Sequence, residues 1–150
     1  MRFGSYNIEI PFNELKGHRR ILMQFPAGLK IHAREIADCV EKETGSEIFI
    51  SSDSCFGACD LAIDLARSVS ADLLIHFGHL PIPNLEIDFP VKFVNATLDI
   101  DIGGVTDMII KSVKEKRISL VTTAQHIDYI CGIKERLEEA GYHVYLLGRL

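Results

Sequence analysis

Short apolar runs alternate with helical patterns along the first hundred residues. Four runs have the length and composition of buried strands: Arg19–Phe25, Glu47–Ser51, Asp72–Phe77 and Val91–Val94. After the first run, Ala33, Ile36, Ala37 and Val40 share one face of a predicted helix, and Gly45 ends it. This order predicts an α/β fold, a parallel sheet with flanking helices.

Two further segments complete this first region. A helix is predicted from about Ala58, with its apolar residues turned inward at Leu61, Ala62, Leu65 and Val69. The stretch before it, Asp53–Gly57, is predicted to be a loop. Another loop follows the third strand and contains Pro81, Pro83 and Pro90.

The pattern begins again after a predicted linker at Asp99–Gly104. The elements expected there are a helix near Val105–Lys116, a strand at Ile118–Thr123, a helix near Ile127–Ala140 and a strand at His143–Leu147. We therefore divide the chain into an N-terminal α/β domain, residues 1–100, and the beginning of a second similar domain, residues 101–150. The chain stops at Gly148–Leu150, where a ligand-binding loop is expected, so we interpret it as a fragment or a half that needs a partner.

Composition and charge narrow the class of protein. Hydrophobic residues make up 47% and charged residues 25%, the balance of a globular protein. The net charge of −5 argues against direct nucleic-acid binding, which uses basic surfaces. No apolar run is long enough to span a membrane, and the N-terminus lacks a signal-peptide pattern, which favours the cytoplasm. In that compartment the four cysteines are expected as thiols or metal ligands.

Three loops that follow predicted strands carry the candidate chemistry. They are Gln24–Leu29, Ser54–Asp60 and His76–Pro81. Because the carboxyl ends of parallel strands share one edge of the sheet, we expect the three loops to lie together. The first loop could bind an anion at the start of the next helix or be an ordinary turn.

Cys59 is the candidate nucleophile or metal ligand of the second loop. The predicted helix N-terminus would favour its thiolate, and the small residues Gly57 and Ala58 would let the backbone approach a ligand. The alternative is a partly buried thiol without function. Cys55 lies four residues earlier, but no third cysteine is near, so this pair alone predicts no cluster. Cys39 and Cys131 are interpreted as packing residues in helices.

The two histidines His76 and His79 flank Gly78 in the third loop. They could ligate a metal, transfer protons or bind an anion. Alternatively, His76 ends a buried strand with one hydrogen bond and His79 is an exposed loop residue. A zinc site from His76, His79 and Cys59 is conceivable but matches no motif spacing.

Taken together, the three loops closely resemble the N-terminal domain of archaeal diphthamide synthase, the 2-(3-amino-3-carboxypropyl)histidine synthase family. The resemblance rests on Gln24–Leu29, on the Gly-Ala-Cys-Asp motif at Gly57–Asp60 and on the His-x-Gly-His motif at His76–His79. It extends from about Arg19 to the end of the chain.

The resemblance implies a radical transferase. Three similar α/β domains each supply one cysteine to a [4Fe–4S] cluster, whose open iron binds S-adenosylmethionine. The reduced cluster cleaves the bond from sulfur to the γ-carbon, and the 3-amino-3-carboxypropyl group is transferred to a histidine of translation elongation factor 2. The archaeal enzyme is a homodimer.

Residue by residue, the resemblance makes Cys59 the first cluster ligand. The second and third ligands of the family lie beyond Leu150, so the chain alone is expected to be inactive. Gly57, Ala58, His76, Gly78 and His79 are expected to contact the cluster or S-adenosylmethionine.

Two other functions remain open from the sequence. One is a dehydratase that resembles quinolinate synthase, which also has one cluster cysteine in each of three α/β domains. The other is a non-catalytic module that retains one cluster cysteine and supports a catalytic partner.

Overall fold

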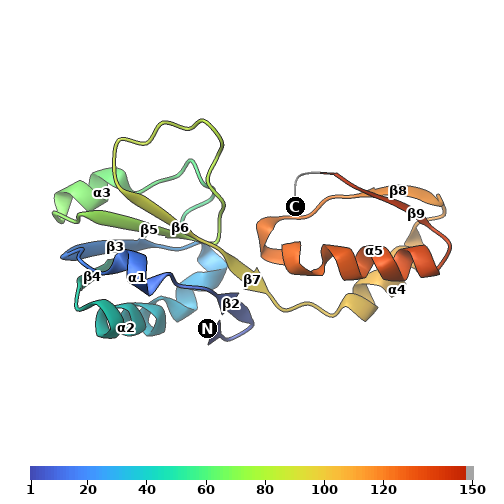
Figure 1. The fold of residues 1–150 in the computed structure, drawn as a ribbon, viewed down its shortest axis with the longest axis horizontal. Coiled ribbons are helices and arrows are strands. Elements are labelled where there is room, and N and C mark those ends of the chain that lie inside the picture. The colour runs from blue at the N-terminus through green and yellow to red at the C-terminus, as the bar shows by residue number, and fades with distance from the viewer. Residues whose placement is uncertain (148–150) are drawn as a thin grey trace. The chain divides into compact units, whose positions relative to one another are not determined.

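The chain divides between Ala96 and Thr97 into two units. The computed structural model describes residues 1–147, and each unit has its own parallel strands and its own hydrophobic core. Both units combine these strands with helices (Figure 1), so the predicted α/β fold class is confirmed.

The first unit is built on a sheet of four parallel strands. Their spatial order is β4-β3-β5-β6. The strands are β3 (Arg20–Gln24), β4 (Glu47–Ile50), β5 (Leu73–Phe77) and β6 (Val91–Val94). Each strand lies within its predicted segment. The prediction succeeded because continuous apolar runs are typical of the buried strands of a parallel sheet, and β3 and β5 form the buried centre of this one.

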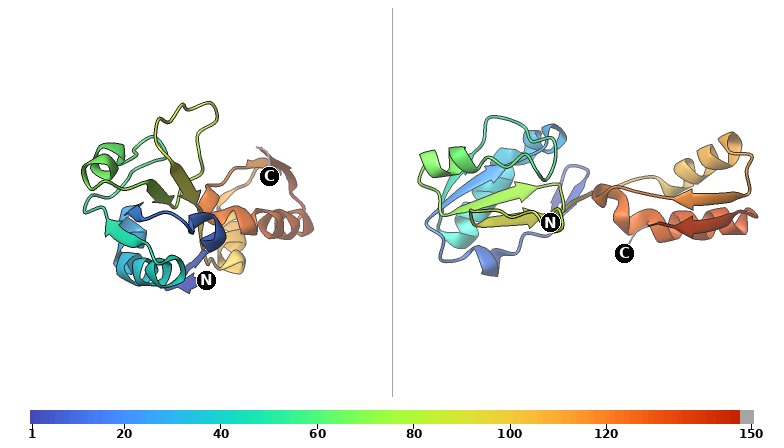
Figure 2. Two further views of the ribbon diagram at one scale, coloured as in Figure 1. Left: turned by 60° about the vertical axis from the view of Figure 1, so that its left-hand side comes forward. Right: turned by 90° about the horizontal axis from the view of Figure 1, so that it is seen from above.

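Helices cover both faces of this sheet. The 3₁₀ helix η1 (Ala27–His32) leads into α2 (Ala33–Thr44), and α2 packs against the face that carries Ile21, Met23 and Ile75. The short helix α3 (Ile63–Ser68) lies on the opposite face, where Ala66 meets Leu22 and Leu74. Figure 1 and the left view of Figure 2 show α2 and α3 on opposite sides of the strands.

The helix α2 is the one that the sequence predicted most closely. Its four apolar residues, Ala33, Ile36, Ala37 and Val40, are all buried. Gly45 ends the helix in the left-handed conformation, with φ +73°, and its N–H donates to the carbonyl of Glu41. Glycine adopts this conformation without the steric cost that other residues meet.

The N-terminal segment forms structure that the sequence patterns did not predict. The strands β1 (Arg2–Phe3) and β2 (Tyr6–Ile8) pair as a tight antiparallel hairpin, followed by α1 (Phe12–Leu15). The small sheet has the order β1-β2-β7, with β7 at Ala96–Leu98. Such short elements do not show a periodic pattern, which explains why they were missed.

The helix expected from Ala58 begins five residues later, at Ile63. The prediction was wrong because side chains hold the intervening backbone in turns: the Phe56 N–H donates to the Asp60 carboxylate at 3.0 Å, and the Ala62 N–H donates to Gln24 Oε1 at 3.1 Å. Three of the four residues predicted to face inward, Leu61, Ala62 and Val69, nevertheless pack against the core on this face of the sheet. Ala66 is the buried residue of α3, and Leu65 is 38% exposed.

The second unit combines two α-helices with one pair of parallel strands. Its elements are α4 (Ile102–Ser112), β8 (Arg117–Leu120), η2 (Ala124–Tyr129), α5 (Ile130–Glu139) and β9 (His143–Leu146). Its core gathers around Leu137, Tyr142 and Val144. The predicted linker at Asp99–Gly104 is only partly irregular, because α4 begins at Ile102 and ends earlier than expected.

Candidate functional site

The candidate site lies where β3, β4 and β5 end. The segment after β4, residues 51–60, is the cysteine loop, and its backbone is hydrogen-bonded to the end of β3. Ser51 N–H donates to the Met23 carbonyl at 2.8 Å, and Cys55 N–H donates to the Phe25 carbonyl at 3.0 Å. Cys55 also forms a parallel bridge with Pro26. The segments that follow β3 and β4 are therefore in contact, as the shared edge of a parallel sheet predicts.

Gly78 brings the loop after β5 close to the loop after β3. It has φ +81°, and a Cβ added to it would lie 2.9 Å from Pro26 Cγ. Only glycine fits both the left-handed backbone and this close approach. The turn after β5 thus explains why a glycine stands at position 78. This turn directs His79 back toward the cysteine loop.

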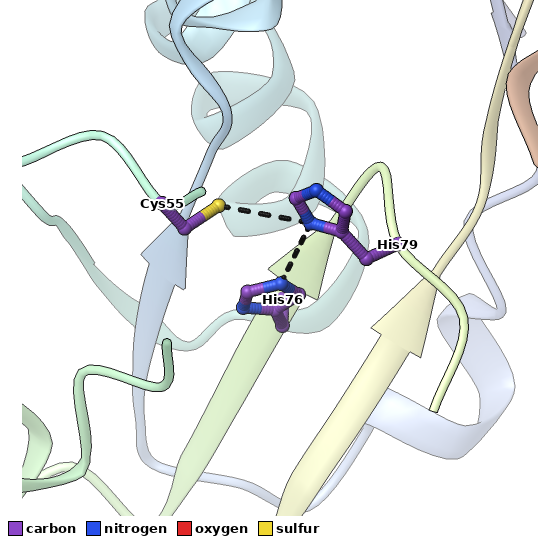
Figure 3. Close-up of side chains that lie close together, drawn as sticks. All are labelled: Cys55, His76 and His79. Atoms are coloured by element: carbon purple, nitrogen blue, oxygen red, sulfur yellow. Dashed lines mark hydrogen bonds between the residues drawn. The ribbon is translucent and has the colours of Figure 1, made fainter. Parts of the chain in front are cut away.

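Cys55, His76 and His79 meet at this edge of the sheet (Figure 3). His76 Nε2 lies 2.9 Å from His79 Nδ1, and Cys55 Sγ lies 3.9 Å from the same His79 nitrogen. Their three possible ligand atoms all lie within 4.8 Å of one another. One thiol and two imidazoles form a donor set that suits Zn²⁺ or a similar soft divalent ion.

Burial shifts the proton affinities of two members of this group. The pKa of His76 is lowered to about 4, first by burial and then by the neighbouring His79, so the ring is neutral near pH 7. The pKa of Cys55 is raised to about 11, mainly by burial and further by the charge of Asp60. Without a bound cation, Cys55 therefore remains a thiol.

Gln24 opens the first candidate loop, but the sequence analysis gave this residue no role of its own. It is the last residue of β3 and is buried. Its Oε1 lies 3.0 Å from His76 Nδ1, and its Nε2 donates to the Asp60 carbonyl at 2.8 Å. A glutamine at the end of an otherwise apolar central strand was the available signal, because buried polar side chains are normally hydrogen-bonded.

Cys59 lies in the turn after Cys55 and is exposed. Because α3 begins only at Ile63, Cys59 is not at a helix N-terminus, and the expected stabilisation of its thiolate by a helix dipole was wrong. The turn is closed by the Asp60 N–H, which donates to the Gly57 carbonyl at 3.1 Å. Gly57 is next to the thiol: an added Cβ would lie 3.9 Å from Cys59 Sγ.

The predicted residues therefore fall into two groups within one edge. His76 and His79 gather around Cys55, which had been left unassigned, and Gly78 lies against Pro26. Gly57 and Cys59 belong to the turn of the second loop, where Cys59 is exposed. Ala58 is buried, so its side chain does not face solvent. The zinc set considered from the sequence contains Cys59, and the structure groups the histidines with Cys55 instead.

Comparisons with known proteins agree with these motifs. The family model of diphthamide synthesis proteins matches residues 25–149. A 2-(3-amino-3-carboxypropyl)histidine synthase from Pyrococcus horikoshii is 37% identical over 91% of this chain and 42% of its own length. Subunit 1 of the same enzyme from Caenorhabditis elegans is 32% identical over 83% of this chain and 33% of its own length.

A solved structure supports the same relationship. The crystal structure of Dph2 from Pyrococcus horikoshii with a 4Fe-4S cluster superposes with a TM-score of 0.77 at 34% identity, covering 92% of this chain and 43% of that one. The chain thus spans about two fifths of the length of the archaeal relative. In the part of the chain that the structure describes, no helix is both long and apolar enough to cross a membrane. The matched family model, these relatives and the shared fold lead to one conclusion: the chain belongs to the diphthamide synthesis protein family.

Proposed function

We propose that this chain takes part in the first step of diphthamide biosynthesis. In that step the 3-amino-3-carboxypropyl group of S-adenosylmethionine is transferred to a histidine of translation elongation factor 2. The observation that carries the proposal is the match, at 34% identity and TM-score 0.77, to a protein whose crystal structure contains a 4Fe-4S cluster. The 37% identity to a 2-(3-amino-3-carboxypropyl)histidine synthase favours this reaction over a quinolinate-synthase-like dehydration.

Cys59 is the residue that would hold such a cluster. Iron–sulfur clusters are held by thiolates, and Cys59 presents an exposed thiol at the carboxyl ends of the strands. Cys55 is less suitable, because burial keeps its thiol protonated. The donors of this edge fit one corner of a cluster, so the remaining thiolates must come from outside the first unit. When bound, the cluster supplies the electron that cleaves the sulfur–γ-carbon bond of S-adenosylmethionine.

The neighbouring residues would shape the space around that ligand. Gly57 has no side chain to block an approach to Cys59 Sγ. The Asp60 carboxylate accepts the Phe56 N–H and keeps the turn closed. His79 is half-buried and would be the histidine that meets S-adenosylmethionine, whereas the fully buried His76 would act through it.

The proposal also assigns partners and a location. Elongation factor 2 would be the protein substrate, and the active assembly would be a homodimer in the cytoplasm, where translation takes place. The protein substrate and the location follow from the family's reaction, in which the acceptor histidine belongs to a protein and must reach the carboxyl edge of the sheet. The homodimer is what the resemblance to the archaeal family implies.

Anaerobic reconstitution of the complete gene product tests the proposal. Wild type should bind iron and sulfide, show the absorbance of a [4Fe–4S] cluster and label elongation factor 2 from S-adenosylmethionine with a labelled carboxyl carbon. Cys59→Ser should lose most of the cluster and the label. Cys131→Ser, which removes another exposed thiol, is the matched control and should retain both.

Two results would contradict the proposal separately. Normal cluster content in Cys59→Ser would remove Cys59 from the ligand set. A wild-type protein that holds its cluster but transfers no label to elongation factor 2 would make the reaction assignment wrong while leaving the cluster ligand in place.

A further inference from the structure

The side chain of Gln24 joins the two groups of residues at the candidate site. It contacts the turn that follows Cys59 through the Asp60 carbonyl and the Ala62 N–H, at 2.8 and 3.1 Å. The same amide contacts His76 Nδ1 at 3.0 Å. A single buried amide thus connects β3, the cysteine turn and the histidine near the end of β5.

The two backbone partners fix which way this amide faces. A carbonyl can only accept a hydrogen bond, so the Gln24 atom facing the Asp60 carbonyl must be the NH₂ group. A backbone N–H can only donate, so the atom facing Ala62 must be the amide oxygen. The same oxygen faces His76, and therefore His76 Nδ1 carries the hydrogen and donates to it.

This arrangement determines the tautomer of His76 and then that of His79. A neutral imidazole with a hydrogen on Nδ1 has a lone pair on Nε2, and complete burial of the His76 ring favours this uncharged form. His76 Nε2 lies 2.9 Å from His79 Nδ1. Two lone pairs would repel at this distance, so His79 Nδ1 must carry a hydrogen and donate to His76.

Cys55, the third side chain of this cluster, does not change the assignment. Its Sγ is 3.9 Å from His79 Nδ1, a longer contact than the one between the two imidazoles. The hydrogen on His79 Nδ1 therefore belongs to the shorter contact, the one to His76 Nε2. In the neutral form of His79, Nε2 then has the remaining lone pair, on the side of the ring turned away from both neighbours (Figure 3).

We propose that Gln24 is a positioning residue that acts through His76 to hold His79 as the Nδ1–H tautomer, with Nε2 available to a ligand as a hydrogen-bond acceptor. The group that meets His79 is consequently an N–H or O–H donor, such as a primary ammonium, and not a carboxylate. The identity of that ligand rests on the proposed function, whereas the tautomers do not. The same amide also holds the Asp60–Ala62 backbone that follows Cys59.

Long-range proton–nitrogen NMR of the ¹⁵N-labelled wild-type chain near neutral pH tests the assignment directly. The expected spectrum has a protonated Nδ1 and an unprotonated Nε2 on both His76 and His79. The variants His76→Gln and His79→Gln assign the signals. A wild-type His79 with its hydrogen on Nε2 would overturn the proposal, and this result needs no variant to fold.

Gln24→Met tests whether the glutamine is the cause. Methionine matches its length but cannot accept from His76 or Ala62, so we expect both tautomers of each histidine to become populated. Gln125→Met in η2 is the matched control and should leave both ring signals unchanged. If Gln24→Met folds and keeps the wild-type tautomers, Gln24 is not the positioning residue.

The readout separates this inference from the proposed function. The tautomers are measured without iron, S-adenosylmethionine or elongation factor 2, so a failed transfer assay leaves them untouched. Conversely, if the NMR spectrum shows the predicted tautomers but no label reaches elongation factor 2, Gln24 remains the positioning residue. Only the proposed ligand of His79 would then be wrong.

Discussion

Two segments of the chain follow the same path and end in different chemistry. In the first unit, β3 leads through η1 and α2 to β4, and in the second unit β8 leads through η2 and α5 to β9. The parallel pairing begins in the same way, with Arg20 opposite Glu47 and Arg117 opposite His143. Each 3₁₀ helix starts at the same spacing from its arginine and runs directly into the α-helix.

The difference appears at the carboxyl end of the first strand of each segment. Gln24 lies four residues after Arg20 and is buried among hydrogen-bond partners. Val121 lies four residues after Arg117 and is 72% exposed. The shared backbone path therefore follows from apolar periodicity and a glycine after the helix. The candidate site needs more: a particular side chain, Gln24, at the end of β3, and the neighbouring strand β5, which places His76 beside that side chain.

Truncating one core residue in each segment should give the greatest change, because the equivalent helices are buried to different extents. Ile36 follows Arg20 at the same spacing as Ile133 follows Arg117, but Ile36 is fully buried and Ile133 is only half-buried. Ile36→Ala should lower the free energy of unfolding of the first unit by about 2–5 kcal/mol. Ile133→Ala should cost the second unit clearly less. Hydrogen exchange measured by mass spectrometry follows each unit separately, and equal losses would contradict the difference in burial.

The next effect concerns pH and belongs to the first unit alone. Folded His76 has a pKa of about 4, below its ordinary value of 6.5. Between these values the unfolded chain binds more protons, so the contribution of His76 is complete above pH 6.5 and is lost as the pH falls toward 4. Its upper limit is about 3 kcal/mol.

Urea unfolding at several pH values measures this contribution. The slope of stability against pH between 6.5 and 4 should be smaller in His76→Gln than in wild type. His143→Gln, at an exposed position of β9, is the control and should keep the wild-type slope. An unchanged slope in His76→Gln would show that the buried ring is not the group that titrates.

A smaller loss of stability is expected at the glycine that follows the α-helix in both segments. Gly45 after α2 has φ +73° and Gly141 after α5 has φ +82°, and an added Cβ meets no atom within 4 Å at either position. Alanine should therefore cost each unit only the backbone penalty of about 1–2 kcal/mol. Local hydrogen exchange at the two helix ends should report similar losses, and a large difference between Gly45→Ala and Gly141→Ala would break the equivalence of the two segments.

Prediction from the sequence succeeded where one local signal was sufficient. The strands around Leu22 and Leu74 were predicted because uninterrupted apolar runs fit the interior of a parallel sheet. The end of α2 was predicted because Gly45 favours the left-handed cap. By contrast, α3 was placed too early because the turns after Cys55 are held by the side chains of Asp60 and Gln24, which act across 4 and 38 residues of sequence.

Patterns along the chain were enough to establish the α/β class, the central strands and the three loops whose motifs resemble one family. They also singled out Cys59, His76 and His79. The folded chain was needed to show that both histidines gather around Cys55, that Cys59 stands in an exposed turn, and that Gln24 holds the two together. This division arises because periodicity reports burial along one element, whereas hydrogen-bond partners and tautomers depend on which strand ends meet, and pairing in the sheet decides that.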